Sequence, residues 1–533
     1  MQYGISTTVL LLRNALLSLN SSSICHVHWL QVIVALLVLT VCIFPYWRTP
    51  TGINAPFAGF RSPWEPPLLV QMRYVFNAAS MIREGYAKWK DSLFQISRYD
   101  GDILIVPPRY LDDLHNKSQE KLSAIHGLIR NFGGSYSGIT LLGENDVGIR
   151  ALQTKITPNL AKLCDDIRDE FQYCLDTDFP ACRDWTLVSV HPLFLKAVER
   201  ITHRIFVGLP LCRNPQWVQA TSGHAHYATM IQIAMRSVPK FVQPLLNFCL
   251  PWPWKNAACV REAKNALILE MQRRRDLEKV NNFDYIKSND LLQAVMEMSS
   301  PVYEDSQLDV VAQIMLTMNT IAGHSTAASG AHALFDMVSH SEYIEVLREE
   351  ALQVFRHVEP RVTKQALGDL RKLDSFLRES QRHNPLSLLG FFRVVLDPAG
   401  ITLQDGTHVP YNTLLCVAPH AISNDPDVME DPTSFNGLRY YEQRCRDASQ
   451  EKKHQYATAD KSHLHFGYGT WACPGRFLAS DMLKVILTML LLQYDIRSPE
   501  GAKRPVAGHF HEFPLFNINT PLLMKRRNDS LVL

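Results

Sequence analysis

Residues 466–479 read FGYGTWACPGRFLA, and this stretch decides the expected fold. Glycines at 467, 469 and 475 surround Cys473, and Pro474 follows it directly. The next residues, FLASDMLKVILTMLLLQY, have the period of an apolar helix, so Pro474 is expected near the first helical turn, where its missing N–H costs nothing. The pattern therefore places Cys473 at a helix N-terminus. Backbone N–H groups and the helix dipole at such a position lower the pKa of a thiol and stabilise its thiolate.

The glycine-rich turn and the cysteine together indicate a particular kind of ligand site. Glycines just before Cys473 allow the backbone to approach a large, flat group. A thiolate in this position is a good axial ligand for haem iron, because it pushes electron density onto the metal and makes bound dioxygen easier to split. A buried cysteine in a glycine turn, with no chemical role, is the alternative interpretation.

The spacing F-x-x-G-x-x-x-C-x-G, formed by Phe466, Gly469, Cys473 and Gly475, resembles the haem-binding signature of the cytochrome P-450 family. The resemblance implies that Cys473 is the iron ligand of haem b (iron protoporphyrin IX) and that the other three residues shape the cofactor-binding loop. Trp471 stands where the family often has His or Arg against a haem propionate. Its indole N–H can donate one hydrogen bond there, but it brings no charge.

A second resemblance concerns three charged residues before this loop. Glu379 and Arg382, in the helical segment LGDLRKLDSFLRESQRHNP, have i,i+3 spacing on one helical face and resemble the family's E-x-x-R pair. In DPTSFNGLRY, Phe435 and Arg439 resemble the later element that adds a third charge to that pair. The resemblance implies a buried ion network that braces the cysteine loop. Exposed i,i+3 pairs are common, so the pair alone would be weak support.

Arg393 lies eleven residues beyond Arg382, in FFRVVLDPAG, where family members commonly carry an arginine that binds a haem propionate. The alternative is an ordinary charge near the end of a strand. Arg150 is a further basic residue that falls where the family uses one against a propionate, although Asp146 replaces the Trp or His expected four residues earlier.

Residues 309–337, DVVAQIMLTMNTIAGHSTAASGAHALFDM, are predicted to form a long buried helix with small residues at its middle. The patch AGHSTA, residues 322–327 with Gly323 at its second position, resembles the family's A-G-x-D/E-T-T/S, which leaves room for dioxygen beside the iron. Read directly, Thr326 takes the threonine position and Ser325 replaces the acid. In the A-x-H-T-T form of many fungal members, His324 replaces the acid and Ser325 is the first alcohol. Either register implies that His324, Ser325 and Thr326 deliver protons to bound oxygen; a Ser/Thr patch bonded to helical carbonyls is the alternative.

The N-terminal region is predicted to hold a membrane anchor. Residues 29–47, WLQVIVALLVLTVCIFPYW, carry no charge and end in aromatic residues, and about 20 such residues cross a bilayer core. A buried core helix or a cleaved signal peptide are the alternatives. The predicted organisation is a tail at 1–28, a transmembrane helix at 29–47, a proline-rich linker at 48–67 and a haem-thiolate catalytic domain at 68–533.

Composition sets limits on the class of protein. The chain has 533 residues, and its 54 Lys and Arg balance 52 Asp and Glu, which is not expected of a protein that binds nucleic acid. Its 11 cysteines form no C-x-x-C pair, so a disulfide scaffold is not expected and a reducing compartment is favoured. Residues 441–462 are polar and mixed in charge, which predicts a solvated surface loop.

The resemblance extends to residues 64–96, 150–160 and 206–217, which look like segments of fungal microsomal members of secondary pathways. It implies a mostly helical fold with a small β lobe (α+β). It also implies a monooxygenase that inserts one oxygen atom from dioxygen into a lipophilic substrate of a terpenoid, meroterpenoid or indole-diterpene pathway. The expected electron donor is NADPH–cytochrome reductase, a flavoprotein, with cytochrome b5 as a further partner.

The expected location is the endoplasmic reticulum membrane, with one span and a cytosolic catalytic domain. Two other functions use similar sites. One is a reductase-independent haem-thiolate isomerase or dehydratase, and the other is a membrane-tethered haem or sterol binding protein without turnover.

Overall fold

The computed structural model describes residues 52–136, 138–281, 286–299, 305–356, 361–505, 508–515 and 518–528. The predicted tail, the predicted transmembrane helix and the first residues of the predicted linker lie outside this part of the chain. Among the helices that are described, none has the length and apolar character needed to span a bilayer.

Helices dominate the fold, as the sequence predicts. In chain order they are α2 (Pro67–Trp89), α3 (Leu111–His115), α4 (Ala124–Asn131), α5 (Leu141–Glu144), α6 (Val147–Ala151), α7 (Leu160–Thr177), α8 (Val190–Val207), α9 (Pro215–Arg236), α10 (Gln243–Cys249), α11 (Pro251–Asn281), α12 (Leu291–Met298), α13 (Asp305–Ser339), α14 (Glu342–Phe355), α15 (Lys364–Asp369), α16 (Arg371–His383), α17 (Pro419–Ser423), α18 (Arg439–Cys445) and α19 (Arg476–Gln493).

The strands are short, and they are β1 (Phe57–Ala58), β2 (Phe94–Ile96), β3 (Ile103–Ile105), β4 (Leu122–Ser123), β5 (Thr186–Ser189), β6 (Gly390–Val395), β7 (Ile401–Thr402), β8 (His408–Val409), β9 (Leu414–Val417), β10 (Tyr494–Arg497), β11 (Gly508–Phe510), β12 (Phe513–Leu515) and β13 (Pro521–Arg526). The largest sheet has the order β1-β2-β3-β9-β6-β4, and a second has the order β10-β13-β5. The pairs β7-β8 and β11-β12 complete the set. The predicted small β lobe corresponds to the largest sheet.

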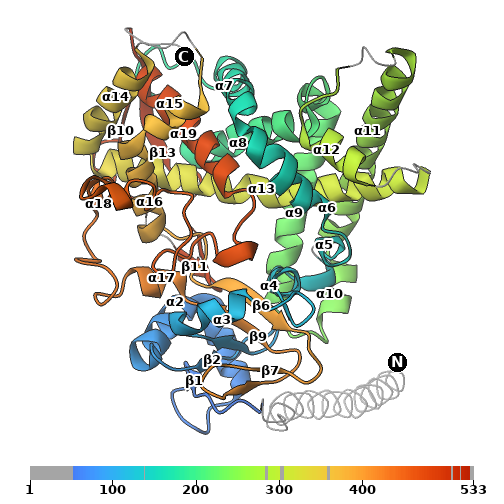
Figure 1. Ribbon diagram of the computed structural model, residues 1–533, viewed down its shortest axis with the longest axis vertical. Coiled ribbons are helices and arrows are strands. Elements are labelled where there is room, and N and C mark those ends of the chain that lie inside the picture. Colours follow the sequence, from blue (N-terminus) through green and yellow to red (C-terminus); the bar gives the residue numbers. More distant parts are fainter. Residues whose placement is uncertain are drawn as a thin grey trace, which may run out of the picture.

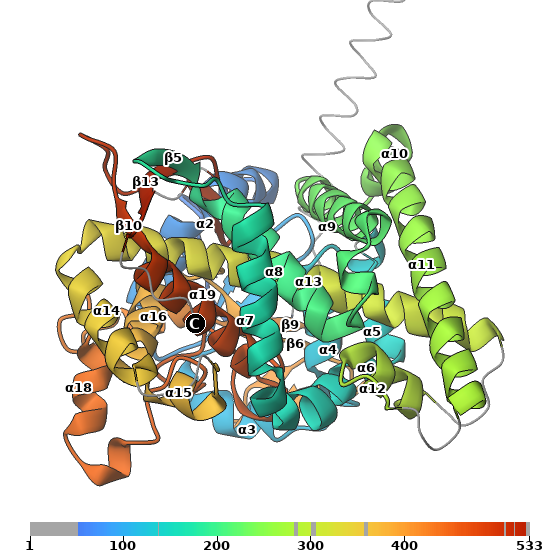
Figure 2. The ribbon, with the colours of Figure 1, turned by 90° about the horizontal axis from the view of Figure 1, so that it is seen from above.

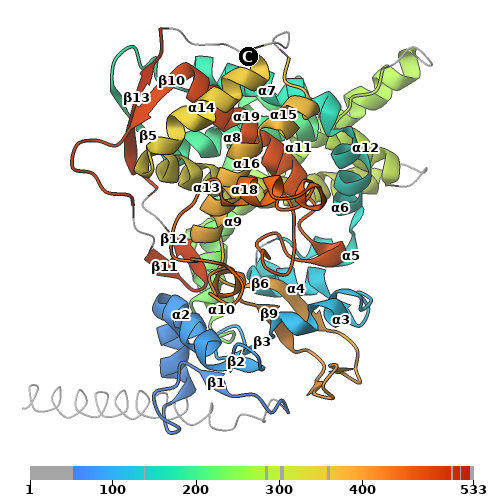
Figure 3. The ribbon, with the colours of Figure 1, turned by 60° about the vertical axis from the view of Figure 1, so that its left-hand side comes forward.

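The sheet and the helices occupy different ends of the molecule. Figure 1 shows the six-stranded sheet with α2 and α3 at the lower end and the main helical part above it. In Figure 2, α13 runs across the molecule with α8 beside it, and these two helices contact each other. Figure 3 shows α16 next to α18, which it also contacts.

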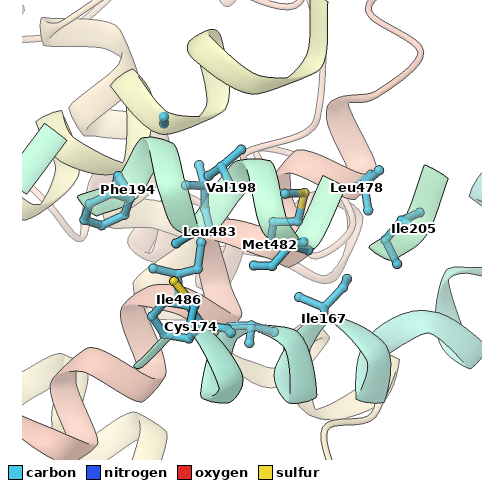
Figure 4. Close-up of a cluster of buried hydrophobic side chains, with 14 of the residues drawn as sticks. Ile167, Cys174, Phe194, Val198, Ile205, Leu478, Met482, Leu483 and Ile486 are labelled. Atoms are coloured by element: carbon cyan, nitrogen blue, oxygen red, sulfur yellow. The ribbon is translucent and has the colours of Figure 1, made fainter. Parts of the chain in front are cut away.

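The main core forms where α7, α8, α13 and α19 meet. Nearly every residue of α19 from Leu478 to Gln493 is buried, and its buried charges Asp481 and Lys484 are paired with Lys364 and Asp374. Figure 4 shows part of this core, in which side chains of α7, α8 and α19 point toward one another. This packing fixes α19 within the helical part, and with it the loop that ends in Cys473.

Two regions differ from the sequence-based picture. Phe57 and Ala58, in the predicted linker, pair with β2, so these two residues belong to the sheet. The segment predicted as a solvated loop, 441–462, contains Tyr456, which is almost fully buried. Its ring packs edge-to-face on Phe466, with 5.3 Å between ring centroids. Because most residues around Tyr456 in the sequence are polar, the sequence pattern did not indicate that Tyr456 is buried.

Candidate active site

The cysteine loop closes directly in front of α19. The Cys473 N–H donates to the Phe466 carbonyl at 2.7 Å, which draws the loop into a tight turn. Gly475 is the N-cap of α19, and the helix begins at Arg476. The N–H groups of Gly475 and Arg476 donate to the Cys473 sulfur, so the predicted position of this thiol at a helix N-terminus is observed.

Two glycines are required by the shape of this loop. Gly467 and Gly469 have φ of +82° and +69°, a left-handed conformation that side chains disfavour. A Cβ at Gly469 would also lie 2.7 Å from Nδ1 of His115. Gly469 therefore lets the C-terminal end of α3 pack directly against the loop, and His115 is a neighbour that the sequence did not reveal.

The surroundings of the Cys473 thiol differ from the sequence-based expectation. Cys473 is exposed in the described chain, but the protein atoms around its sulfur still desolvate the thiolate and raise the pKa of the thiol. The two backbone N–H groups and the charge of Arg476 oppose this shift but do not outweigh it. The predicted lowering of the pKa is therefore wrong for the thiol alone, because desolvation is the larger effect. A bound metal cation would reverse the balance, since a coordinating thiol loses its proton.

Arg393 is a buried cation without a matching anion. Its residue is 5% exposed, and burial lowers the pKa of the guanidinium to about 10. Nη1 donates to the Phe392 carbonyl at 2.9 Å, and the guanidinium lies over the Phe391 ring. No carboxylate among the described residues forms an ion pair with it. Because an uncompensated buried charge is unfavourable, this arrangement indicates an anionic ligand.

The other positions predicted to face a propionate bring no unpaired charge. Arg150 is exposed, and its Nε donates to Asp146 at 2.8 Å, so it is paired within α6 and its preceding turn. Trp471 is partly buried and is the last residue of a short 3-10 helix, Gly469–Trp471. Of the three residues predicted to bind a propionate, Arg393 is therefore the one with a charge that no carboxylate in the described chain pairs with.

The structure brings Glu379, Arg382 and Arg439 together. Arg382 donates twice to Glu379, at 2.9 and 2.7 Å, and both side chains are fully buried. Nε of Arg439 reaches the same carboxylate at 3.3 Å. Burial opposes ionisation of Glu379, but hydrogen bonds from Arg382 and His383 outweigh it and lower the pKa of Glu379 to about 2.

These arginines hold the backbone of the segment before α18. Arg382 donates to the Pro432 carbonyl at 2.6 Å, and Arg439 donates to the Glu430 and Ser434 carbonyls at 2.6 and 3.0 Å. The network thus braces residues 430–436 directly, while the cysteine loop comes later in the chain.

Arg378 is the residue that ties α16 to the approach to the cysteine loop. Its fully buried guanidinium donates to the Gln455 and Thr458 carbonyls at 2.5 and 3.1 Å, and to the carboxylate of Asp460 at 2.6 Å. The sequence analysis missed it. Its i,i+4 spacing to Arg382 was the available signal, but its partners lie about 80 residues away and no local pattern reveals them.

On α13, neighbouring polar residues have different surroundings. Ser325 is exposed, whereas Thr326 is buried and donates its hydroxyl to the Ala322 carbonyl at 3.2 Å. Nε2 of His324 is buried and finds no hydrogen-bond partner in the described chain. Ser329, one turn after Ser325, is hydrogen-bonded to Tyr456, and the ring of Tyr456 packs on Phe466 at the start of the cysteine loop.

The side of α13 that carries Ser325 and Ser329 therefore faces the cysteine loop. Gly323 points elsewhere, since a Cβ on it would approach Glu199 of α8 at 3.8 Å. This geometry favours the register in which Ser325 is the first alcohol and His324 takes the position of the acid.

The donor set fits a haem. It consists of one accessible thiol for the iron and one buried guanidinium that needs a carboxylate, and small residues line the facing helix. Iron protoporphyrin IX carries both a metal that binds thiolate and two propionates. Within the described chain, no cluster of three or more His, Cys, Asp and Glu side chains offers a site for a bare metal ion.

Comparisons with known proteins agree with this site. The family model Cytochrome P450 matches residues 188–518. The cytochrome P450 monooxygenase ltmK of Epichloe festucae (strain Fl1) is 96% identical over 533 residues, which cover 100% of both chains. The cytochrome P450 monooxygenase terK of Tolypocladium album is 54% identical over 503 residues, covering 94% of this chain and 95% of terK.

A solved structure gives the same fold. Retinoic acid-bound cyanobacterial CYP120A1 superposes with a TM-score of 0.63 at 18% identity, covering 89% of this chain and 99% of that chain. Because the family model covers more than half of the chain and the relatives match along nearly its whole length, the chain belongs to the cytochrome P450 family, as a monooxygenase of the type found in fungal secondary metabolism.

Proposed function

We propose that this chain is a membrane-anchored haem-thiolate enzyme that inserts one oxygen atom from dioxygen into a lipophilic substrate of a terpenoid, meroterpenoid or indole-diterpene pathway. The observation that carries the proposal is the position of Cys473 just before α19, in the loop that the Ser325 and Ser329 side of α13 faces through Tyr456. The related chains ltmK and terK are named monooxygenases, which favours this function over the isomerase and binding-protein alternatives.

In this proposal Cys473 binds the iron of haem b and Arg393 binds a propionate. Phe466, Gly469, Trp471 and Gly475 shape the loop that holds the cofactor. When bound, haem supplies the redox-active iron at which dioxygen is reduced and one oxygen atom is transferred. The N–H groups of Gly475 and Arg476 stabilise negative charge on the sulfur, because each already donates to it.

In this proposal the polar residues of α13 move protons to the reacting site. We assign the final transfer to the Ser325 hydroxyl, which lies on the exposed face of the helix. His324 is next to Ser325 in the chain, and its Nε2 is buried without a partner in the described chain, so we assign the resupply of that proton to its ring. Thr326 has a supporting role, because its hydroxyl is committed to the helix backbone.

The proposed substrate is lipophilic because apolar side chains flank the reacting region. Ile321 precedes Ser325 by one turn and is 43% exposed on the same side of α13. Ala322 and Ala328 beside it add no polar group. Electrons are proposed to arrive from NADPH–cytochrome reductase, with cytochrome b5 as a further donor, because the chemistry requires single-electron delivery.

Membrane attachment is proposed from two features. The first is the uncharged segment 29–47. The second is a set of large apolar side chains exposed on α2, on α10 and beside them, at 49–82% of their surface: Trp64, Leu69, Met72, Phe76, Phe241, Leu245, Phe248 and Trp254. Helices α2 and α10 lie toward the sheet end of the molecule, as does β1, close to the start of the described chain (Figure 1). The proposed location is the endoplasmic reticulum membrane.

The proposal is tested by turnover with a fungal NADPH–cytochrome reductase in membranes, fed with extracts of a related producing fungus. The expected result is a product one oxygen atom heavier than its precursor, formed with equal consumption of NADPH and dioxygen. Cys473→Ser should abolish this product. Cys445→Ser, which alters an exposed cysteine on α18, is the matched control and should retain it. Product formation without NADPH or dioxygen would contradict the proposal.

A further inference from the structure

Strand β6 is irregular where it approaches the cofactor site. Gly390 pairs with Val417 and Arg393 pairs with Leu415, so three steps along β6 match two steps along β9. One extra residue is therefore inserted, which is a β-bulge. Within it, Phe391 has φ of +56°, a left-handed conformation that is rare and unfavourable for a bulky residue.

Phe391 is held in this conformation by its surroundings. It is 4% exposed and belongs to a buried cluster with Leu104, Leu114 and Leu464. On the adjacent face, Gly127 of α4 lies so close that a Cβ there would be 2.6 Å from the Phe392 carbonyl oxygen and 2.7 Å from the Arg393 nitrogen. The backbone of residues 392 and 393 therefore has little freedom to move away from the site.

The ring of Phe391 supports the guanidinium of Arg393. Cζ of Arg393 lies 3.9 Å from the ring centroid, which is a close cation–π contact. A guanidinium stacked on a ring keeps the N–H groups of its edge available for bidentate hydrogen bonds to a carboxylate. A carboxylate partner within the protein would instead occupy those N–H groups and neutralise the charge. Only Nη1 is used by the described chain, on the Phe392 carbonyl.

We propose that Phe391 is a positioning residue: its ring fixes Arg393 in the orientation that binds a haem propionate, and the bulge of β6 is kept because it presents this pair to the site. The inference rests on the proposed haem function of Arg393. Phe391 acts on the cofactor only through Arg393. This role gives a reason for the unfavourable backbone conformation of Phe391 in the buried strand β6.

A double-mutant cycle on the haem-loaded full chain tests the proposal. We would compare wild type, Phe391→Leu, Arg393→Met and the double variant. The first readout is the rate of haem transfer to excess apomyoglobin, and the second is the midpoint potential of the iron. Phe391→Leu should accelerate haem loss about 5- to 30-fold, the range expected for a desolvated cation–π contact. In the Arg393→Met background the same change should alter the rate by less than about twofold.

The midpoint potential of the iron distinguishes a positioning role of Phe391 from a role in packing alone. A fixed cation near the propionates stabilises the reduced iron, so Phe391→Leu should lower the midpoint potential when Arg393 is present and leave it unchanged when Met replaces it. Phe392→Leu is the matched control, because its ring is not stacked on Arg393 and should show no coupling to it. Phe391→Met is a second variant without a ring should the leucine variant fold poorly.

The outcomes are distinct. Equal acceleration of haem loss by Phe391→Leu in both backgrounds, with no change in potential, would show a packing role alone and overturn the inference. Wild-type protein that binds no haem would overturn both this inference and the proposed function. Haem binding with a thiolate spectrum but no coupling between Phe391 and Arg393 would overturn this inference and leave the proposed function standing.

Discussion

Ser325 and Thr326 are adjacent on α13, yet their hydroxyl groups meet different surroundings. Ser325 is exposed on the side that faces the cysteine loop, and Thr326 is buried with its hydroxyl on the Ala322 carbonyl. The sequence left two registers open here, because both alcohols fit the pattern. Burial and hydrogen bonding, which depend on the rotation of the helix in the fold, favour Ser325.

Replacement of Ser325 tests this assignment at the level of one hydroxyl group. Ser325→Ala should lower the product formed per NADPH consumed by about tenfold or more, because a positioned proton donor contributes at least that much to the reaction. Thr326→Ala, the matched control, should have a much smaller effect. The measurement is product, hydrogen peroxide and NADPH in one assay. A larger loss of coupling in Thr326→Ala would reverse the assignment.

Replacement of Arg382 tests whether the ion network stabilises the fold. Arg382→Met leaves the buried Glu379 carboxylate without its bidentate partner, so the free energy of unfolding should fall by about 3 to 5 kcal/mol. Denaturant unfolding of the purified variant measures this change. Asp276→Asn, which alters an exposed residue of α11, should change it by less than about 0.5 kcal/mol. A similar small change in Arg382→Met would contradict a structural role.

At the level of elements, a buried ion cluster joins segments that are far apart in the chain. Glu512, in the turn between β11 and β12, accepts hydrogen bonds from Tyr74 of α2 at 3.0 Å and from Arg236 of α9 at 3.0 and 3.1 Å. Nη1 of Arg98, which follows β2, lies 3.6 Å from the same carboxylate. Glu512 thus links the hairpin to α2, to the end of α9 and to the segment after β2.

This cluster makes a pH-dependent contribution to stability. Burial opposes ionisation of Glu512, but the charges of Arg236 and Arg98 outweigh it and lower the pKa from its ordinary 4.5 to about 2. A lowered carboxyl pKa stabilises the fold above the unfolded value, and the contribution is lost as the pH falls from 4.5 toward 2. Glu512→Gln should therefore cost about 3 to 5 kcal/mol at neutral pH.

The difference between wild type and Glu512→Gln should then shrink as the pH falls through that range, because the wild-type carboxylate becomes protonated as well. Unfolding measured across the pH series checks this. Glu349→Gln, an exposed change on α14, should stay within about 0.5 kcal/mol of wild type at neutral pH. A difference for Glu512→Gln that stays constant in acid would contradict the assigned pKa.

At the scale of the whole molecule, local patterns predicted the elements well and their mutual contacts poorly. The helical period after Cys473 and the apolar run at 309–337 correspond to α19 and α13. The bulge of β6, the partners of Arg378 and the cluster around Glu512 could not be predicted. Their partners are set by tertiary packing, as in Tyr74 and Glu512, which are 438 residues apart.

Attachment of the whole chain to a membrane is a further prediction. Because residues 29–47 carry no charge, the full chain should resist extraction from microsomes by alkaline carbonate. Replacing both Leu36 and Leu37 by Arg should make it extractable, since charges at the centre of such a segment are strongly disfavoured in a bilayer. Complete extraction of the unchanged chain would contradict a transmembrane anchor.

The central claim is that the Cys473 thiolate binds haem iron, and the spectrum of the reduced protein under carbon monoxide tests it most directly. The wild-type chain should show the strongly red-shifted Soret band of a thiolate-ligated complex, and Cys473→His should lose that shift while Cys445→Ser keeps it. A wild-type spectrum without the shift, or a Cys473→His spectrum that retains it, would contradict the account.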